Sequence, residues 1–473
     1  MLQILCLFIV FMCFWHESCS YHYSNGHDIF KSFKTKAKKY HPPPPAHRMY
    51  PPPPPPPAPA NPSQPPAPTG RTKSPSTKPG QAPLAVVESE AAFTLYHGRN
   101  FKVIQNLFYN FTYLLLQQVG DSIGKDWDLN ISVFPDPLTN FTLDTSSAVG
   151  FLELLGCVGK LKGVPVSFGV ASPCISQLIL QGTIPTVELD NSSVDLNATS
   201  LNVTFEALFG SSTNVQLPGR GQNQSNYVSF DSSIDRGPLQ RAEWIKFLAS
   251  FVDMEQRANI VYDKIQSNYQ CLNASGKGNN VSKPLVAWAS YSMDLGVWTF
   301  SNDPYKLQLN LDAGGLNLDY ANLSVFFNMS IEANVEDFHT IASTLDVMID
   351  ETYIPDPSGY TWDNLTTSAN ITDKSAFPFL VHKRLWRHDK RIGINNALDW
   401  MEGANAQPQV VLRDLIEVLY PPLNDGRGYN ITYFRNIAIG ESFVNTTTSE
   451  CPRVDMTSAL EPTIIPCTNQ SRF

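Results

Sequence analysis

The chain lacks the short signatures of the common hydrolases and nucleotide-binding enzymes. Its 473 residues contain no G-x-S-x-G, no G-x-x-x-x-G-K-[ST] and no H-E-x-x-H, the motifs of nucleophile turns, phosphate loops and zinc proteases. Adjacent acids such as Asp350 and Glu351 occur, but adjacency in sequence does not set the separation of two carboxylates across a glycosidic bond. The sequence therefore favours a binding protein over an enzyme and implies no catalytic cofactor.

Residues that ligate metals are few and scattered. The four histidines of residues 84–473 are His97, His339, His382 and His388. None of them forms H-x-H or H-x-x-x-H, and no C-x-x-C occurs. A bare Zn²⁺ or Mn²⁺ would need ligands from distant loops, such as Asp350, Glu351 and His382. We therefore expect no metal site built directly from side chains and favour a chelate or organometallic ligand.

Long apolar runs are absent after the first twenty residues. Residues 4–15 are apolar but too short to span a bilayer, and Ser18 and Ser20 are small residues that suit cleavage after Ser20. Residues 1–20 are therefore predicted to be a signal peptide. The final TIIPCTNQSRF is too polar for a lipid-anchor signal. We expect a secreted protein, extracellular or in the cell wall, with no transmembrane segment in the mature chain.

Charge is unevenly distributed along the chain. Residues 1–83 carry nine Lys/Arg and two Asp/Glu, a balance of +7. Because the formal net charge of the whole chain is −9, the remaining residues carry −16. An acidic globular part with a basic arm argues against nucleic acid as a partner. The basic arm could instead contact an acidic cell-wall polysaccharide.

A proline-rich segment separates the signal peptide from the globular part. Residues 41–83 hold more than half of the 37 prolines, and such a run adopts extended polyproline II rather than helix or sheet. We expect residues 21–83 to be a disordered, proline-rich extension. A wall tether and a plain spacer are equally open interpretations.

N-x-[ST] glycosylation acceptors are dense. Sixteen occur, at Asn110, Asn130, Asn140, Asn191, Asn197, Asn202, Asn223, Asn273, Asn280, Asn322, Asn328, Asn364, Asn370, Asn430, Asn445 and Asn469. Some arise by chance, but this density behind a signal peptide favours a eukaryotic secreted glycoprotein. Each used site also marks a surface position.

Five cysteines remain after removal of the signal peptide, an odd number. In an oxidising compartment they are disulfide candidates. Cys157–Cys174 and Cys451–Cys467 close the shortest loops and leave Cys271 over. The connectivity itself is not fixed by the sequence.

Strand and helix patterns alternate on either side of one long apolar stripe, which predicts an α/β fold. Strands are expected at 111–117, 183–189, 227–230, 284–291, 344–349 and 377–382, and helices at 149–155, 303–312 and 399–420. Between them, apolar residues recur at spacings of three and four behind Pro238. The pattern predicts one helix of about 50 Å over 238–272, joining α/β lobes at 92–237 and 283–437, with a ligand cleft between the lobes. Residues 438–473 are predicted to form a tail with a disulfide.

The order of these segments over residues 92–437 resembles the class III periplasmic binding proteins, the helical-backbone receptors for metal ions, ferric siderophores, haem and cobalamin. The resemblance rests on FTLYHGRNFKVI, LDTSSAVGFLELLGCVGKLKGV, ASPCISQLILQGTIPTVE, PLQRAEWIKFLASFVDMEQRANIVYDKI, LVAWASY and RLWRHDKRIGINNALDWMEGANAQPQVVLRDLIEVLYP. There is no lipobox before Cys19, and the proline-rich extension and the glycosylation acceptors suit a eukaryotic secreted member. A membrane importer is not implied.

The resemblance implies a ligand held between the lobes by loops at the strand ends. The candidate residues are Thr145, Ser146, Ser147 and Ser172 on lobe one, and Trp288, Tyr291, Trp298, Glu351, His382, Trp386, Arg387 and Arg391 on lobe two. The aromatic residues could stack on a planar chelate or pack in the core. The basic cluster of residues 382–391 could bind an anionic chelate or be a solvated loop paired with Asp389 and Asp399.

Two functions follow from these features. The first is a secreted, N-glycosylated solute receptor that binds an iron chelate, haem, a cobalamin-like ligand or a metal ion between its lobes. The alternative is a proline-rich structural or signalling glycoprotein of the cell wall, without a small ligand.

Overall fold

The computed structural model describes residues 86–117, 131–165, 168–187, 205–211, 226–276, 282–320, 325–421 and 429–467. The predicted signal peptide and the proline-rich extension lie outside these residues, as do the predicted tether and polysaccharide contact. Ala82–Phe473 form one compact unit. No helix within the described ranges is both long and apolar enough to traverse a bilayer.

Lobe one begins with an open four-stranded sheet, β1-β2-β3-β4. Its strands are β1 (Phe93–His97), β2 (Phe101–Asn106), β3 (Phe111–Leu116) and β4 (Ile131–Pro135). On one face, Phe93 and Tyr113 contact Phe247 edge-on, whereas Tyr96 on β1 is 62% exposed. The predicted strand at 111–117 is confirmed. Only Tyr113 and Leu115 of this strand are fully buried, because the sheet is covered on one side.

A smaller parallel sheet lies deeper in lobe one. It comprises β5 (Phe141–Leu143), β8 (Ala207–Gly210) and β9 (Tyr227–Ser229), all buried. The nearby elements are η1 (Ser146–Ala148), α3 (Val149–Leu155), η2 (Val158–Lys160), α4 (Pro173–Leu180), the pair β6 (Val164–Pro165) and β7 (Thr186–Val187), and η4 (Ser232–Ile234). The predictions of a helix at 149–155 and a strand at 227–230 are confirmed. Of the strand expected at 183–189, Thr186 and Val187 form β7, and residues 188–189 lie outside the described ranges.

The segment predicted as one helix over 238–272 forms two helices. α5 (Pro238–Val252) ends at Asp253, whose φ of 61° is left-handed, and α6 (Glu255–Gly276) follows. The two helices lie side by side, because Lys246 of α5 sits 4.3 Å from the ring centroid of Tyr262 on α6. The prediction of a single helix is therefore wrong.

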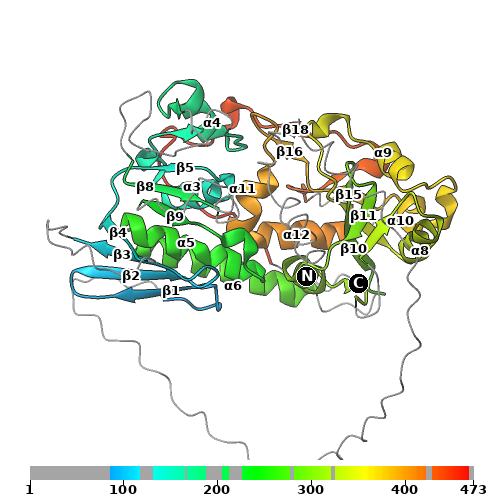
Figure 1. Ribbon diagram of the computed structural model, residues 1–473, viewed down its shortest axis with the longest axis horizontal. Coiled ribbons are helices and arrows are strands. Elements are labelled where there is room, and N and C mark those ends of the chain that lie inside the picture. Colours follow the sequence, from blue (N-terminus) through cyan, green and yellow to red (C-terminus); the bar gives the residue numbers. More distant parts are fainter. Residues whose placement is uncertain are drawn as a thin grey trace, which may run out of the picture. The chain divides into compact units, whose positions relative to one another are not determined.

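Of these two helices, α6 is the one that runs from one lobe into the other. Its first half contributes Ala258, Val261 and Ile265 to the core of lobe one, and its second half contributes Tyr269 and Leu272 to a separate core in lobe two. At 1.5 Å per residue its 22 residues span about 33 Å. Figure 1 shows α5 and α6 together between β1–β3 and the helices above. The two-lobed α/β architecture with a helical connector is confirmed.

Lobe two is built on a seven-stranded sheet, β13-β11-β10-β14-β15-β17, with β12 beside β10. Its strands are β10 (Leu285–Ser292), β11 (Val297–Phe300), β12 (Leu316–Asn317), β13 (Phe326–Asn328), β14 (Val347–Asp350), β15 (Leu385–Arg387) and β17 (Arg435–Asn436). β10, β14 and β15 are mutually parallel. The strand predicted at 284–291 is confirmed. The strand predicted at 344–349 also forms, but β14 begins three residues after the predicted start.

Helices cover the sheet of lobe two. They are α7 (Pro304–Asp312), α8 (Glu332–Ala342), α9 (Trp362–Ser368), α10 (Pro378–Val381), α11 (Asp399–Ala406) and α12 (Pro408–Leu419), with the short turns η5 (Pro357–Gly359), η6 (Lys374–Ala376), η7 (Ile437–Ile439) and η8 (Thr448–Glu450). The helix predicted at 303–312 is confirmed. The strand predicted at 377–382 is wrong, since Pro378 opens a helical turn there. The helix predicted at 399–420 divides before Pro408.

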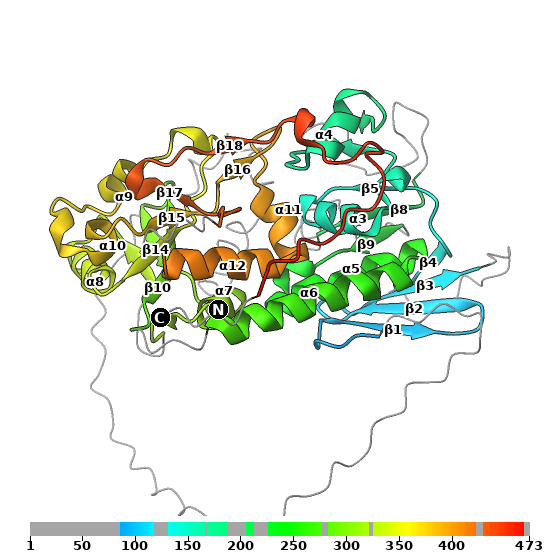
Figure 2. The same ribbon diagram turned by 180° about the vertical axis from the view of Figure 1, so that it is seen from behind.

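Residues 446–467, which we call the C-terminal strap, leave lobe two and cross lobe one. The strap follows β18 (Val444–Asn445), which pairs with β16 (Arg391–Ile392). Figure 2 shows it in red, passing α4 and α3 and then descending toward α6. Along this path Leu460 donates its backbone N–H to the Glu153 carbonyl, and Ile465 donates to the side chain of Asn268.

The strap corrects the predicted disulfides. Cys451 is bonded to Cys174 on α4, and Cys467 is bonded to Cys271 on α6. Cys157 is a buried free thiol. The pairings Cys157–Cys174 and Cys451–Cys467 are wrong, because the strap carries Cys451 to α4 and Cys467 to α6.

Candidate functional site

The carboxyl ends of the parallel strands of lobe two place charged side chains together. β10, β14 and β15 run parallel, so their carboxyl ends share one edge of the sheet. Glu351 directly follows β14 and His388 directly follows β15. In open α/β sheets this edge is where ligands bind.

Glu351 is the centre of a polar group at this edge. Its carboxylate lies 2.6 Å from Lys306 Nζ and 3.6 Å from His388 Nε2. Burial opposes ionisation of Glu351, but Lys306 and His388 outweigh it and hold the pKa of Glu351 below its ordinary value. The Glu351 side chain retains 12% exposure, whereas Lys306 and His388 are buried.

Aromatic rings adjoin this polar group. The His388 ring stacks on Trp400 of α11, with 5.1 Å between centroids. Trp400 in turn lies 5.8 Å from Trp288, and Lys306 Nζ lies 5.7 Å from the Trp288 ring centroid. We call Glu351, Lys306, His388 and Trp400 the carboxyl-edge cluster. It combines one anion, a cation, an imidazole and an aromatic face.

Several buried polar atoms near the cluster have no partner within the described part of the chain. They are Tyr305 Oη, Trp386 Nε1 and His388 Nδ1. Tyr305 and Trp386 belong to the lobe-two core that also contains Trp288 and Trp400. Buried polar atoms are nearly always hydrogen-bonded in proteins, so unpartnered atoms around one site are consistent with a bound ligand or water.

A residue of α5 reaches the same region. The guanidinium of Arg241 stacks 3.6 Å above the ring of Tyr305 and lies 3.6 Å from Asp303. Asp303 is the N-cap of α7, which also carries Lys306. α5 thereby connects the first-lobe core to the helix that supports the cluster.

The four candidates on lobe one have local roles. Thr145 caps η1 through a hydrogen bond from Ser147 N, and its hydroxyl lies 2.9 Å from that of Ser147. Ser146 and Ser147 are half-buried. Ser172 is buried, caps α4 by accepting from Ile175 N, and donates its hydroxyl to Glu153.

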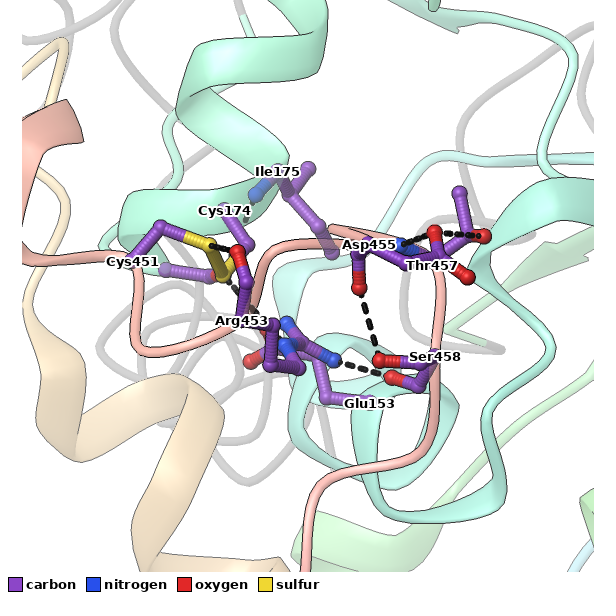
Figure 3. The surroundings of a disulfide bond; sticks show 9 residues. Glu153, Cys174, Ile175, Cys451, Arg453, Asp455, Thr457 and Ser458 are labelled. Carbon is purple, nitrogen blue, oxygen red and sulfur yellow. Dashed lines mark hydrogen bonds and ion pairs between the residues drawn. A yellow bond between two sulfur atoms is a disulfide. The ribbon is translucent and has the colours of Figure 1, made fainter.

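Ser172 also lies at a contact between the lobes. The Glu402 carboxylate of α11 accepts the backbone N–H groups of Ala171 and Ser172 at 2.5 and 3.0 Å. Arg453 of the C-terminal strap contacts Glu153, as Figure 3 shows beside the Cys174–Cys451 disulfide. Burial raises the pKa of Glu402 well above its ordinary value, and the neighbouring carboxylates reinforce the rise.

The structure separates the basic residues of 382–391. Arg387 is buried, contacts Asp350 and Asp389, and lies over the ring of Tyr360. Arg391 pairs with Asp399 at 2.9 Å. His382 is exposed at the end of α10, and Trp386 is buried on β15. Arg384 donates to the backbone carbonyls of Val418 and Leu419. These residues therefore do not form one cationic surface.

The aromatic candidates of lobe two separate likewise. Trp288 is 1% exposed and donates its indole N–H to Asn310. Trp298 is fully buried in a second core of lobe two. Tyr291 is half-buried and lines a cavity of about 560 Å³ beside α9. Of the predicted site residues, Glu351 and Trp288 come together at the carboxyl edge.

Sequence reasoning missed Lys306, His388 and Trp400 as ligand candidates. His388 lies within the basic cluster of residues 382–391 but is not singled out there, and Trp400 lies within the helix predicted at 399–420. The signal that could have found His388 is the short apolar pair Leu385 and Trp386 just before it, which lies in the parallel strand β15. Among the described residues, no three His, Cys, Asp or Glu side chains are grouped so as to hold a metal ion.

No family model matches the chain. It is 24% identical over 229 residues to an uncharacterized lipoprotein of Methanocaldococcus jannaschii, an alignment that covers 46% of this chain and 54% of the relative. The chain therefore spans about half the length of the curated relative that it matches.

Solved structures similar to the chain include bacterial binding proteins. The periplasmic heme-binding protein of Vibrio cholerae is 16% identical with a TM-score of 0.43, covering 60% of this chain and 99% of that one. A periplasmic binding protein of Veillonella parvula is 9% identical with a TM-score of 0.45, covering 71% and 99%. A Helicobacter pylori protein solved with Ni(II) bound is 12% identical with a TM-score of 0.40, covering 66% and 91%. Periplasmic binding proteins are thus among the solved structures to which this chain is similar.

Proposed function

We propose that the protein is a secreted, N-glycosylated solute receptor of the helical-backbone periplasmic-binding type. It binds a chelated metal or another anionic organic ligand at the carboxyl-edge cluster and is not an enzyme. The observation that carries this proposal is the partly exposed Glu351, held between Lys306 and His388 at the carboxyl edge of three parallel strands.

The chemistry of the cluster favours a ligand with both charge and planar surface. A carboxylate of the ligand can replace Glu351 as the acceptor of the charge-assisted hydrogen bond from the Lys306 ammonium, because both carboxylates are anionic acceptors. The stacked rings of His388 and Trp400 add aromatic surface beside the charged groups, and such surface suits the planar part of a haem or chelate. A ferric chelate, haem or a cobalamin-like molecule therefore fits better than a bare metal ion.

The surface positions of the glycosylation acceptors support the secreted part of the proposal. The acceptor asparagines within the described ranges are Asn110, Asn140, Asn273, Asn328, Asn364, Asn370, Asn430 and Asn445, and none is buried. Surface exposure is what attached glycans require.

The test is a thermal-shift panel on the full chain with haem, ferric siderophores, cobalamin, Fe³⁺ and Ni²⁺, followed by titration of any ligand that raises Tm. Lys306→Met is expected to weaken that ligand about tenfold or more, because a charge-assisted contact contributes roughly 1.5–3 kcal/mol. Lys374→Met, at an exposed pair with Asp363, is the matched control and should leave affinity unchanged. Failure of every ligand to raise Tm, or equal affinities for both variants, contradicts the proposal.

A further inference from the structure

A cavity in lobe two lies where several glycosylation acceptors meet. It has a volume of about 560 Å³ and is lined by residues of the β10–β11 turn, the segment after β13, and α9. Its walls include Tyr291, Ser330, Asn364, Thr367 and Asn370. Asn364 and Asn370 each begin an N-x-T acceptor, and Ser330 completes the acceptor of Asn328.

The Asn364 amide is held in one orientation. Asn364 is the third residue of α9, and its Oδ1 accepts both the backbone N–H and the hydroxyl of Thr361, at 2.8 and 2.9 Å. This capping box uses only the oxygen of the amide. Nδ2 is the atom that N-glycosylation modifies, so attachment of a sugar leaves the helix cap intact.

The other two acceptors are less suited to fill the cavity. The Asn370 amide nitrogen already donates to the Met329 carbonyl at 3.1 Å. Asn328 does not line the cavity, and its Oδ1 accepts the Ser330 N–H. Asn364 therefore differs from the other two acceptors. Its amide is held in the cavity wall, and its amide nitrogen donates no hydrogen bond among the described residues.

We propose that this cavity seats the first sugars of an N-linked glycan carried by Asn364. The walls suit a carbohydrate, because Tyr291 offers an aromatic ring and Thr367 and Asn370 offer polar groups. In the modification, Asn364 Nδ2 bonds to C1 of the first N-acetylglucosamine. The bond from that C1 to the phosphate oxygen of a lipid diphosphate-linked oligosaccharide breaks, and an Nδ2 proton leaves with the diphosphate.

The consequence is that this glycan is protected from enzymatic release, unlike a glycan on an exposed strand. Asn445, on β18, is exposed and provides the internal comparison. Sugars packed against the walls of the cavity are less accessible to a deglycosylating enzyme than sugars on an exposed strand, so their release should be about tenfold slower. The cavity, rather than the acceptor motif, sets this difference.

The test uses the full chain secreted from eukaryotic cells. Site-resolved mass spectrometry of glycopeptides should find Asn364 occupied, and native digestion with peptide N-glycosidase should release its glycan much more slowly than the Asn445 glycan. Thr367→Trp fills the cavity without altering the Asn364 acceptor and should bring the two release rates together. Thr366→Ser keeps the acceptor and should retain protection.

Each of three results would overturn the proposal. The first is that Asn364 is unmodified on the folded, secreted chain whose other acceptors carry glycans. The second is that the Asn364 and Asn445 glycans of the wild type are released at equal rates. The third is that release from Asn364 stays slow in Thr367→Trp. None of these measurements depends on the carboxyl-edge cluster or its ligand.

Discussion

Glu402 and Ser172 meet across the two lobes: the buried carboxylate on α11 accepts the backbone N–H groups of Ser172 and its neighbour Ala171 at the start of α4. α11 contributes Trp400 to the lobe-two core and Ala406 to the lobe-one core. This end of the boundary between the lobes is therefore closed by hydrogen bonds rather than open to ligand, although the resemblance placed Ser172 among the ligand contacts.

Replacing Glu402 with alanine should destabilise the protein by about 2–4 kcal/mol, because two buried backbone donors lose their acceptor. Urea denaturation of the purified variant measures the change. Glu461→Ala is the control, since Glu461 pairs with Arg257 and Lys264 at 64% exposure, and an exposed pair contributes at most about 1 kcal/mol. Equal losses in both variants would show that the lobe contact contributes little.

The pH dependence of stability should change in Glu402→Gln. Because the pKa of Glu402 is raised in the folded chain, the folded state binds this proton more tightly than the unfolded state. The free energy of unfolding contributed by Glu402 is therefore greatest below the unfolded pKa of about 4.3 and falls as pH rises toward the raised value. Denaturation of wild type and Glu402→Gln from pH 4 to 7 should show the wild type losing stability relative to the variant. A constant difference would contradict this.

Removing the Cys174–Cys451 disulfide should cost about 2–5 kcal/mol, because it closes a loop with a sequence separation of 277. The measurement is thermal denaturation of Cys174→Ser/Cys451→Ser without reductant. Cys157→Ser is the control. It removes a buried thiol that forms no disulfide, so it measures the change in stability that follows from replacing a cysteine alone. Non-reduced peptide mapping should find Cys174 linked to Cys451 and Cys271 linked to Cys467, and any peptide joining Cys157 to another cysteine would contradict the structure.

Asp253 should tolerate glycine better than a β-branched residue. Its φ of 61° is left-handed, a conformation that costs a residue with a β-carbon about 1–2 kcal/mol and costs glycine little. Asp253→Gly should therefore be close to wild type in stability, since the Asp253 side chain is 67% exposed and Lys102 keeps Asp136 and Glu255 as partners. Asp253→Val should be less stable by about 1–3 kcal/mol. Equal stabilities, measured by urea denaturation, would mean that α5 and α6 continue as one helix.

The sequence predicts individual elements well where the local pattern is decisive. The helices at 149–155 and 303–312 and the strand at 284–291 are predicted from apolar spacing and lie where expected. The break at Asp253 is hidden, because apolar residues continue at helical spacing on both sides of it. α5 is buried almost all round, including Arg241, Glu243 and Lys246, so its pattern does not reveal that α6 packs alongside.

The candidate site is only partly predictable. Glu351 follows a recognisable strand, so its place at the carboxyl edge can be expected. Lys306, His388 and Trp400 come from α7, the end of β15 and α11, and only the tertiary fold brings them together. The cysteine pairing fails for the same reason, because the shortest loop is a poor guide when a strap returns across a whole lobe.

The two disulfides interlock along the chain, because Cys271 lies between Cys174 and Cys451, and Cys451 lies between Cys271 and Cys467. Any single backbone cut between Cys174 and Cys467 is therefore bridged by at least one of them. A protease that nicks a surface loop in this stretch would release no fragment until the sulfurs are reduced, so the nicked protein would keep both halves and its full mass in an oxidising environment.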